Sequence, residues 1–145
     1  MNIRPAIFLV ENGCLLLMKY QYSEIVYNLP GGNVEAGETL SQTLVREMQE
    51  ELNLRVEVGQ LLLVAETFHE GKNKAVLHCI FSGRRLAGEP VLNPEHTTSI
   101  GVEWLPLEKL SEVNLYPSVF SFIKNLVIDN QNFNFYAGRI IQQWF

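Results

Sequence analysis

Three glutamates, Glu47, Glu50 and Glu51, lie close together in the segment VREMQEEL. Spacings of three and four residues bring side chains together on a helix, where each like-charged pair costs about 0.2–0.5 kcal/mol. A divalent cation removes this repulsion, because Mg²⁺ and Mn²⁺ prefer carboxylate, carbonyl and water oxygens as ligands. The cluster therefore predicts a metal site. The alternative is a solvated acidic face in which Arg46 pairs with Glu50.

The helix that carries these glutamates is expected to run from about Thr39 to Leu52. Thr39 and Gln42 fit a capping box, in which their side chains satisfy free backbone donors at the start of the helix. The expected buried stripe consists of apolar residues at helical spacing, namely Leu40, Leu44, Val45, Met48 and Leu52. Glu47 and Glu51 border this stripe, so we expect them to be partly shielded from water and harder to ionise.

A glycine-rich loop precedes the helix and contains Gly31, Gly32 and Gly37. Glycine adopts backbone conformations that bulky residues resist, and it lets carbonyl and amide groups approach a ligand closely. The sequence PGG alone is a weak signal, but the spacing from Gly32 through Glu38 and Arg46 to the glutamates is specific. A plain acidic interaction module would leave this glycine spacing unexplained.

This spacing resembles the Nudix box, the signature of the Nudix hydrolase family. The family pattern is Gly, five residues, Glu, seven residues, then Arg-Glu-apolar-x-Glu-Glu-x-Gly-apolar. It is filled here by Gly32, Glu38, Arg46, Glu47, Met48, Glu50, Glu51 and Leu54. Asn53 stands where the family usually has Gly. That glycine ends the helix in a left-handed conformation, and Asn is the next most tolerant residue at such a position.

The resemblance implies an enzyme that hydrolyses a pyrophosphate bond in a nucleoside diphosphate linked to another group, X. A nucleotide sugar, ADP-ribose and a nucleoside triphosphate all remain open as substrates. The resemblance also implies Mg²⁺ or Mn²⁺, held by Glu47, Glu50 and Glu51 and by the carbonyl of Gly31. A non-catalytic nucleotide-binding sensor with the same fold is the alternative, but such a protein is expected to lose box carboxylates, and this chain retains them.

The resemblance assigns further roles outside the three glutamates. Glu38 and Arg46 are expected to brace the loop against the helix through an ion pair, with Gly32 as structural support and Arg46 at the catalytic site. Many family members supply another acid from a later loop, before a strand with Trp. Glu95 in NPEHTTSIGVEW is the candidate for this extra metal ligand, and Glu103 is its rival.

Several residues are candidates for contacts with the substrate. His69 and His78 are candidates to touch phosphate or base, although a single His in a strand is more often structural. Tyr27, like Tyr20 and Tyr22, is a candidate to stack on a nucleobase, or to cover the edge of a sheet.

The composition limits the class of protein. The 145 residues suit a single domain over residues 1–145, and 47% hydrophobic against 19% charged residues favours a sizeable core. The net charge of −5 and the scattered basic residues argue against duplex nucleic acid, but not against a small nucleotide. No apolar run approaches the ~20 residues that span a membrane, and no signal-peptide pattern is seen. A cytoplasmic location is the default expectation.

The segments around the helix predict strands. These are AIFLV and CLLLM, joined by a turn at Asn12-Gly13, then RVEVGQLLLVAETF, KAVLHCIFSGRRL and IGVEWL. Residues 20–32 are expected to form a loop, and Pro117 to open a helix that runs to about Ile128. This order fits the α/β class, and with the resemblance it implies a Nudix-like α/β/α sandwich with a mixed β-sheet.

The C-terminal segment FNFYAGRIIQQWF is strongly apolar. Its pattern fits either a strand or a helix. Large apolar side chains gain roughly 1.5–3 kcal/mol each on burial, so the segment is expected to pack on its own domain or on a second subunit. The second case predicts a homodimer.

Overall fold

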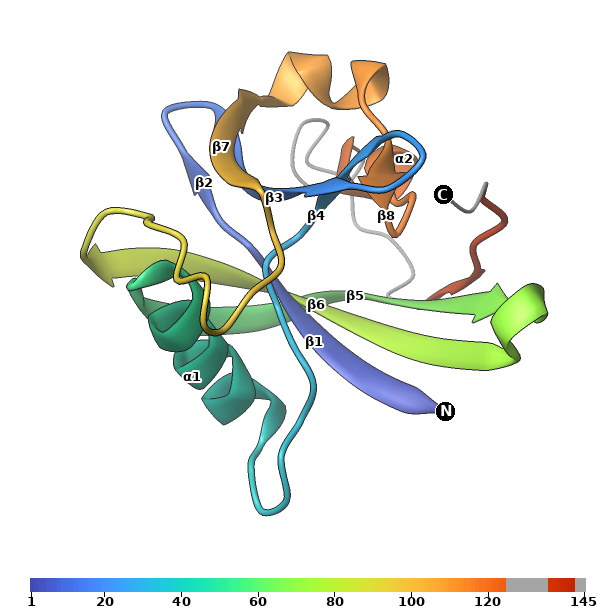
Figure 1. Cartoon of the computed structure of the whole chain (residues 1–145), viewed down its shortest axis with the longest axis horizontal. Helices are drawn as coiled ribbons and strands as arrows, with labels where there is room; N and C mark the ends of the chain where they lie inside the picture. The colour runs from blue at the N-terminus through green and yellow to red at the C-terminus, as the bar shows by residue number, and fades with distance from the viewer. Residues whose placement is uncertain (125–135, 143–145) are drawn as a thin grey trace.

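The computed structural model describes residues 1–124 and 136–142, and the strands of this part form two sheets (Figure 1). The four-stranded sheet has the order β1-β6-β5-β9, with β1 (Asn2–Phe8), β6 (Lys74–Ala87), β5 (Arg55–His69) and β9 (Tyr136–Arg139). The five-stranded sheet consists of β2 (Val10–Glu11), β3 (Cys14–Gln21), β4 (Ile25–Asn28), β7 (Gly101–Pro106) and β8 (Leu115–Tyr116). The helical segments are α1 (Leu40–Leu52), α2 (Phe120–Ile123) and the 3₁₀ turns η1 (Glu70–Lys72) and η2 (Leu107–Glu112).

Both sheets contain parallel and antiparallel pairs. In the first sheet β5 and β6 form a long antiparallel hairpin, while β1 runs parallel to β6 and β9 parallel to β5. In the second sheet β3 pairs antiparallel with β4 and β7, and β8 runs parallel to β4. The predicted α/β class with mixed strand pairing is therefore confirmed.

The predicted boundaries of α1 are confirmed by its caps. At the start, the Thr39 hydroxyl accepts a hydrogen bond from the backbone N–H of Gln42, and the Gln42 side chain accepts one from the backbone N–H of Thr39. At the end, Asn53 adopts the left-handed conformation with φ 55°. The backbone N–H groups of Asn53 and Leu54 close the last turn on the carbonyls of Gln49 and Met48. Asn thus does what Gly usually does at this position.

The buried face of α1 differs from the predicted stripe at one edge. Leu44, Met48 and Leu52 are fully buried, but Val45 is 44% exposed, and Thr43 is buried instead. The prediction that Val45 is buried is wrong because the buried arc is turned toward the side of Thr43. With residues at about 100° intervals, this turn places Glu51 near the middle of the buried arc. The rotation of the helix therefore puts a carboxylate where an apolar residue would be expected.

Two apolar clusters hold the layers together. One contains the buried residues of α1 with alternate residues of β1 and β3, among them Ile7, Leu16 and Met18. The other takes the intervening residues of the same region, among them Ala6, Phe8, Leu15 and Leu17. Because successive strand residues point to opposite faces, β1 and β3 are buried on both faces, and their sequences are continuous apolar runs.

Three expectations about the N-terminal half and the second helix are corrected. The turn at Asn12-Gly13 exists, but it joins β2 to β3, because β1 leaves to pair with β6 in the other sheet. The expected loop over residues 20–32 contains β4, whose Val26 is buried. The helix expected from Pro117 begins instead at Phe120, and residues 125–128 of its predicted range lie outside the described residues.

The described part of the C-terminal segment is a strand. Residues 136–139 form β9, which extends the first sheet, and the backbone N–H of Ile140 donates to the carbonyl of Glu66 at 2.8 Å. Ile140 packs against an apolar cluster of its own chain. Phe133, Phe135, Trp144 and Phe145 lie outside the described residues. Across residues 1–124 and 136–142, no helix has both the length and the apolar character needed to cross a membrane.

Candidate active site

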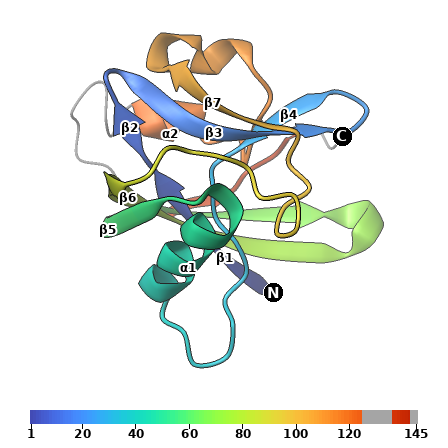
Figure 2. The same cartoon turned by 60° about the vertical axis from the view of Figure 1, so that its left-hand side comes forward.

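The loop before α1 is anchored on β1. The chain leaves β4, passes β1 and turns into α1 (Figure 2). The backbone N–H of Ile7 donates to the carbonyl of Pro30 at 2.8 Å, and the N–H of Gly32 donates to the carbonyl of Pro5 at 3.2 Å. In an antiparallel bridge, hydrogen bonds on the two flanking residues leave the backbone groups of the central residue directed away from the partner strand. The carbonyl of Gly31 is thus directed away from β1.

The next glycine lies directly against the carboxylate helix. A Cβ atom at Gly32 would overlap the carboxyl group of Glu47. A Cβ atom at Gly31 would instead overlap the backbone of β1 at Pro5. The absence of side chains at both positions therefore allows the loop to fit between β1 and Glu47, which explains the glycine pair before the helix.

Arg46 fastens this loop to the helix. Its Nε and Nη2 donate to the two carboxylate oxygens of Glu38 at 2.7 and 3.0 Å, and Nη2 also donates to the carbonyl of Asn33 at 3.0 Å. Glu38 accepts further hydrogen bonds from the Thr43 hydroxyl and from the backbone N–H of Glu35. Hydrogen bonding to Arg46 is the main reason that the pKa of Glu38 falls to about 2. The ion pair expected between loop and helix is present in this geometry.

The remaining terminal nitrogen of Arg46 contacts two of the three clustered glutamates. Nη1 donates to Oε1 of Glu47 at 2.9 Å and to Oε2 of Glu50 at 3.2 Å. The sequence left two interpretations open, a metal site and a solvated acidic face in which Arg46 pairs with Glu50. The structure contains the Arg46–Glu50 pair of the second interpretation, and it also brings the carboxylates of the first close together. Within the described ranges, no three acidic, His or Cys side chains already surround one common point.

Glu51 is compensated only in part, by the positive charge of Arg4. Its Oε2 is buried and has no hydrogen-bond partner. Burial raises the pKa of Glu51 to about 7, and the neighbouring Glu47 adds to this shift. Burial also raises the pKa of Glu47, although the contact with Arg46 opposes it. The prediction that Glu47 and Glu51 are shielded and hard to ionise agrees with these shifts. A buried, unpartnered carboxylate oxygen beside a second acid is a donor set that suits a cation.

The loop over residues 88–99 covers the C-terminal end of α1. The backbone N–H groups of Val91 and Asn93 donate to the carbonyls of Leu52 and Glu51 at 3.0 and 2.9 Å. These bonds bring His96 near the cluster, with Nδ1 4.0 Å from Oε2 of Glu50. Sequence reasoning missed His96, although it directly follows Glu95.

The candidate extra acid of this loop, Glu95, lies on the surface. Its backbone N–H donates to the Asn93 side chain at 3.1 Å. In the part of the chain that the structure describes, no group of three or more acidic, His or Cys side chains, with or without Glu95, is arranged to hold a metal ion. Its rival Glu103 lies in β7, where it accepts a hydrogen bond from the Tyr27 hydroxyl at 3.2 Å.

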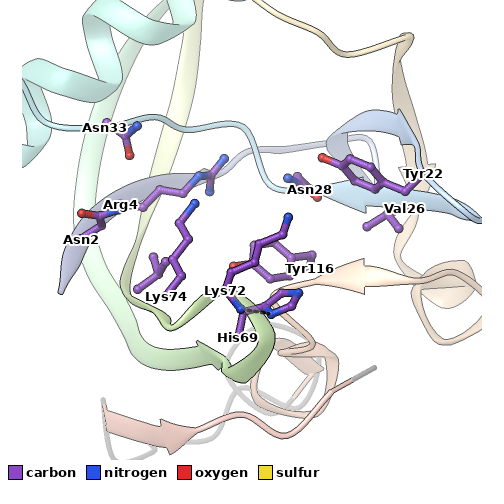
Figure 3. Close-up of a pocket in the computed structure, with 11 residues that line it drawn as sticks. Asn2, Arg4, Tyr22, Val26, Asn28, Asn33, His69, Lys72, Lys74 and Tyr116 are labelled. Carbon is purple, nitrogen blue, oxygen red and sulfur yellow. Dashed lines mark hydrogen bonds between the residues drawn. The ribbon is translucent and has the colours of Figure 1, made fainter. Parts of the chain in front are cut away.

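A pocket of about 360 Å³ opens between β1, the β5–β6 hairpin and the region of β4 (Figure 3). It is rich in basic and aromatic side chains, including Arg4, Tyr22, Lys72, Lys74 and Tyr116. Asn33 lines it as well, and because the Asn33 carbonyl accepts from Arg46, the pocket and the box share a wall. Sequence reasoning missed Arg4, Lys72 and Lys74, because each is an ordinary basic residue in its own segment.

The three candidates for substrate contact lie in different surroundings. His69 lines the pocket, and its Nδ1 accepts from the backbone N–H of Lys72 at 3.3 Å. Tyr27 packs against an apolar cluster and is not among the lining residues of this pocket. His78 is fully buried, with Nε2 2.9 Å from the Thr67 hydroxyl, and burial lowers its pKa to about 3. His78 is therefore a neutral core residue and does not face the pocket.

Comparisons with known proteins agree with the box and the fold. A family model described as "NUDIX domain" matches residues 3–126. The putative nudix hydrolase 1 of Caenorhabditis elegans is 32% identical over 82 residues, which cover 57% of this chain and 21% of that protein. The chain thus matches about a fifth of the length of this relative.

Solved structures share the arrangement of strands and helix. The MutT protein of Methanosarcina mazei Go1 superposes with a TM-score of 0.72 at 25% identity, covering 90% of this chain and 96% of that one. A Streptococcus suis 89-1591 protein described as an ADP-ribose pyrophosphatase gives a TM-score of 0.68 at 18% identity, covering 95% and 97%. With the family model matching most of its length, and with the box built as the sequence predicts, the chain belongs to the NUDIX domain family, as a domain of the Nudix hydrolase type.

Proposed function

We propose that this protein is a metal-dependent hydrolase that cleaves a pyrophosphate bond in a nucleoside diphosphate linked to another group, X. The observation that carries the proposal is Glu51, whose buried carboxylate oxygen has no hydrogen-bond partner and lies beside Glu47. An acid with a buried oxygen that lacks a hydrogen-bond partner is costly in a structural role and useful at a site that binds a cation. The relatives described as a pyrophosphatase and a hydrolase support the class of reaction.

The residues present fit a divalent cation. Glu47, Glu50 and Glu51 would hold it, and the carbonyl of Gly31, which is directed away from β1, is the candidate for a backbone ligand. Because Arg46 contacts both Glu47 and Glu50, the binding of a cation requires these two side chains to exchange part of that contact. When bound, Mg²⁺ or Mn²⁺ supplies positive charge to the pyrophosphate oxygens and lowers the pKa of water.

The chain's own residues then have distinct tasks. Arg46 and Glu38 fix the loop on the helix, so that Gly31 and Gly32 stay beside the carboxylates. One of the three glutamates takes the proton of the attacking water, a task that suits a carboxylate whose pKa is raised toward neutral pH. Fixed positions of base and substrate account for much of the rate in phosphoryl transfer, where catalysis is positioning and charge stabilisation.

The direct test is hydrolysis of a panel of nucleoside diphosphate derivatives. The intact chain would be incubated with nucleotide sugars, ADP-ribose and nucleoside triphosphates in Mg²⁺ or Mn²⁺, and the nucleotide products would be separated and measured directly by liquid chromatography. We expect turnover of at least one class, and loss of it in EDTA. No turnover on any substrate by folded protein would reject the enzyme and favour the nucleotide sensor.

A second measurement tests the cation site without catalysis. Binding to the folded state raises the melting temperature by mass action. We expect Mg²⁺ or Mn²⁺ to raise the melting temperature of the wild type more than that of the Glu47→Gln/Glu51→Gln variant. Equal increases in the two proteins would mean that the cation binds elsewhere. Glu108→Gln, which changes an exposed glutamate in η2, is the matched control and should behave as the wild type.

A further inference from the structure

The pocket beside the box carries an excess of positive charge in an acidic protein. The chain has 11 Lys and Arg against 16 Asp and Glu, yet three of the basic residues, Arg4, Lys72 and Lys74, line this one pocket. Asp and Glu are not found among its described lining residues. A concave surface with one sign of charge concentrates ligands of the opposite sign. The pocket is therefore suited to an anion.

The three cations are also unpaired with carboxylates. Four other basic residues, Lys19, Arg46, Arg84 and Arg85, each form an ion pair with a glutamate. Over residues 1–124 and 136–142, no such pair is found for Arg4, Lys72 or Lys74. Arg4 acts at longer range on Glu47 and Glu51, so Lys72 and Lys74 supply the positive charge that is most available to a ligand.

Arg4 is held in place for such a contact. Its Nη2 donates to the carbonyl of Leu29 at 3.1 Å, which orients the guanidinium group, while Nη1 is buried with no hydrogen-bond partner. Figure 3 shows Arg4, Lys72 and Lys74 directed into the same space from β1 and the β5–β6 hairpin. A guanidinium group with a fixed orientation and an unused donor suits a phosphoryl group.

The pocket and the Nudix box are neighbours in the fold. Asn33 belongs to both, since it lines the pocket and its carbonyl accepts from Arg46. An X group that extends past Asn33 from a pyrophosphate at the glutamates would meet Arg4, Lys72 and Lys74. The volume of about 360 Å³ is at the small end for ligand sites, which suits a compact charged group.

We propose that Arg4, Lys72 and Lys74 form a specificity pocket for substrates whose X group carries a phosphoryl group of its own, as in nucleoside triphosphates, over substrates in which X is an uncharged sugar. The proposal rests on the pyrophosphohydrolase activity proposed above and narrows its substrate class. Tyr22 and Tyr116, which border the pocket, then contact the less polar parts of the ligand.

Paired substrates provide the test, because ATP and ADP-glucose, or UTP and UDP-glucose, share a nucleoside diphosphate and differ in the charge of X. We expect the wild-type kcat/KM to be at least tenfold higher for the triphosphate of each pair. In Lys72→Gln/Lys74→Gln the KM for the triphosphate should rise at least tenfold, while the values for the sugar stay unchanged. Both lysines are exposed, so this variant should fold normally. Arg84→Gln removes one positive charge outside the pocket and should leave the ratio as in the wild type.

A binding experiment separates this proposal from the proposed function. Inorganic tripolyphosphate would be titrated calorimetrically into the intact chain in EDTA, where hydrolysis does not occur. We expect binding by the wild type and Arg84→Gln, and affinity lower by at least tenfold in Lys72→Gln/Lys74→Gln. If the chain binds tripolyphosphate in this way but hydrolyses no substrate, the proposed hydrolase activity is rejected and the proposal of an anion-binding pocket is retained. If hydrolysis is efficient but the ratio of kcat/KM for the triphosphate to kcat/KM for the nucleotide sugar is the same in all variants, the specificity pocket is rejected and the hydrolase activity is retained.

Discussion

Replacing Glu51 with Gln should stabilise the metal-free protein at alkaline pH and leave it unchanged at acidic pH. The side chain keeps its shape, and only its ability to ionise is lost. Ionisation of Glu51 is unfavourable in the folded protein because the carboxylate is buried beside Glu47. Removing an unfavourable charge should therefore favour folding, although it damages the proposed cation site.

The pKa of Glu51 fixes the size and the sign of this effect. The pKa rises from 4.5 in the unfolded chain to about 7 in the folded protein, so the folded state binds the proton more tightly. Stability is then greatest below pH 4.5 and falls as the pH rises to about 7. At about 1.4 kcal/mol per pH unit, ionisation costs about 3 kcal/mol above pH 7 in the metal-free state. Relaxation of Glu47 reduces the observable difference to about 1–3 kcal/mol.

Urea denaturation in EDTA measures this difference directly. The free energy of unfolding of the wild type, Glu51→Gln and the control Glu108→Gln would be compared at about pH 4.5 and about pH 8.5. We expect Glu51→Gln to be the most stable of the three at the higher pH and equal to the others at the lower pH, with the same dependence on urea concentration. A difference of the same size at both pH values would refute the reasoning, because it would come from packing and not from ionisation.

Four further predictions concern the same elements. Glu50→Gln should lower kcat by at least two orders of magnitude in saturating Mg²⁺ while the circular dichroism spectrum stays unchanged, since a ligand charge is lost; a near-normal kcat would remove Glu50 from the proposed ligands. Glu38→Gln should lower the melting temperature at pH 7, and because the Glu38 pKa is depressed to about 2 by Arg46, the difference from wild type should shrink as the pH falls from 4.5 toward 2; a constant difference would contradict an ion-pair origin. Asn53→Ala should lower the free energy of unfolding by about 1 kcal/mol, because alanine is disfavoured in the left-handed conformation of this position, whereas Asn53→Gly should not lower it, because glycine adopts that conformation freely. Equal losses in the two variants would mean that the contacts of the Asn53 side chain matter and not its backbone conformation. For the open alternative of a homodimer, light scattering at micromolar concentration would give the mass of two chains, and the mass of one chain would reject the homodimer and leave the C-terminal segment packed on its own chain.

The parts of the fold that depend on neighbouring residues could be predicted from the sequence. The limits of α1 follow from Thr39, Gln42 and Asn53, whose side chains act on backbone groups within one turn. The ion pair of Glu38 and Arg46 was implied by the resemblance to the Nudix box, and it is local, because Glu38 directly precedes the N-cap Thr39 and Arg46 lies in the second turn of α1. The hairpin of β5 and β6 is likewise local, since a single 3₁₀ turn joins its strands.

The parts that depend on distant segments were predicted wrongly or missed. The run AIFLV looks like the partner of CLLLM, yet β1 pairs with β6, which lies far along the chain, and nothing in either segment specifies that choice. The exposure of Val45 depends on how α1 is rotated over the sheets, which is decided by packing and not by helical spacing.

The basic pocket could not be predicted from the sequence either. Arg4 comes from β1, while Lys72 and Lys74 come from the turn and strand that follow β5, so their charges look scattered in sequence and converge in the fold. These three basic residues of the pocket therefore did not emerge from the sequence. His96 reaches the cluster for a comparable reason, since the loop after β6 folds back over the end of α1.

The two backbone hydrogen bonds from the loop after β6 to the end of α1 determine where this chain tolerates inserted peptide. The backbone N–H groups of Val91 and Asn93 donate to carbonyls in the last turn of the helix, and one of these carbonyls belongs to Glu51. Extra residues between Val91 and Asn93 would prevent the two hydrogen bonds from forming together, and the end of α1 that carries Glu51 would then be held less firmly. An insertion after Pro94, in the exposed residues 94–96, would lie outside the two hydrogen-bonded positions and is the point in this loop where inserted peptide should disturb them least.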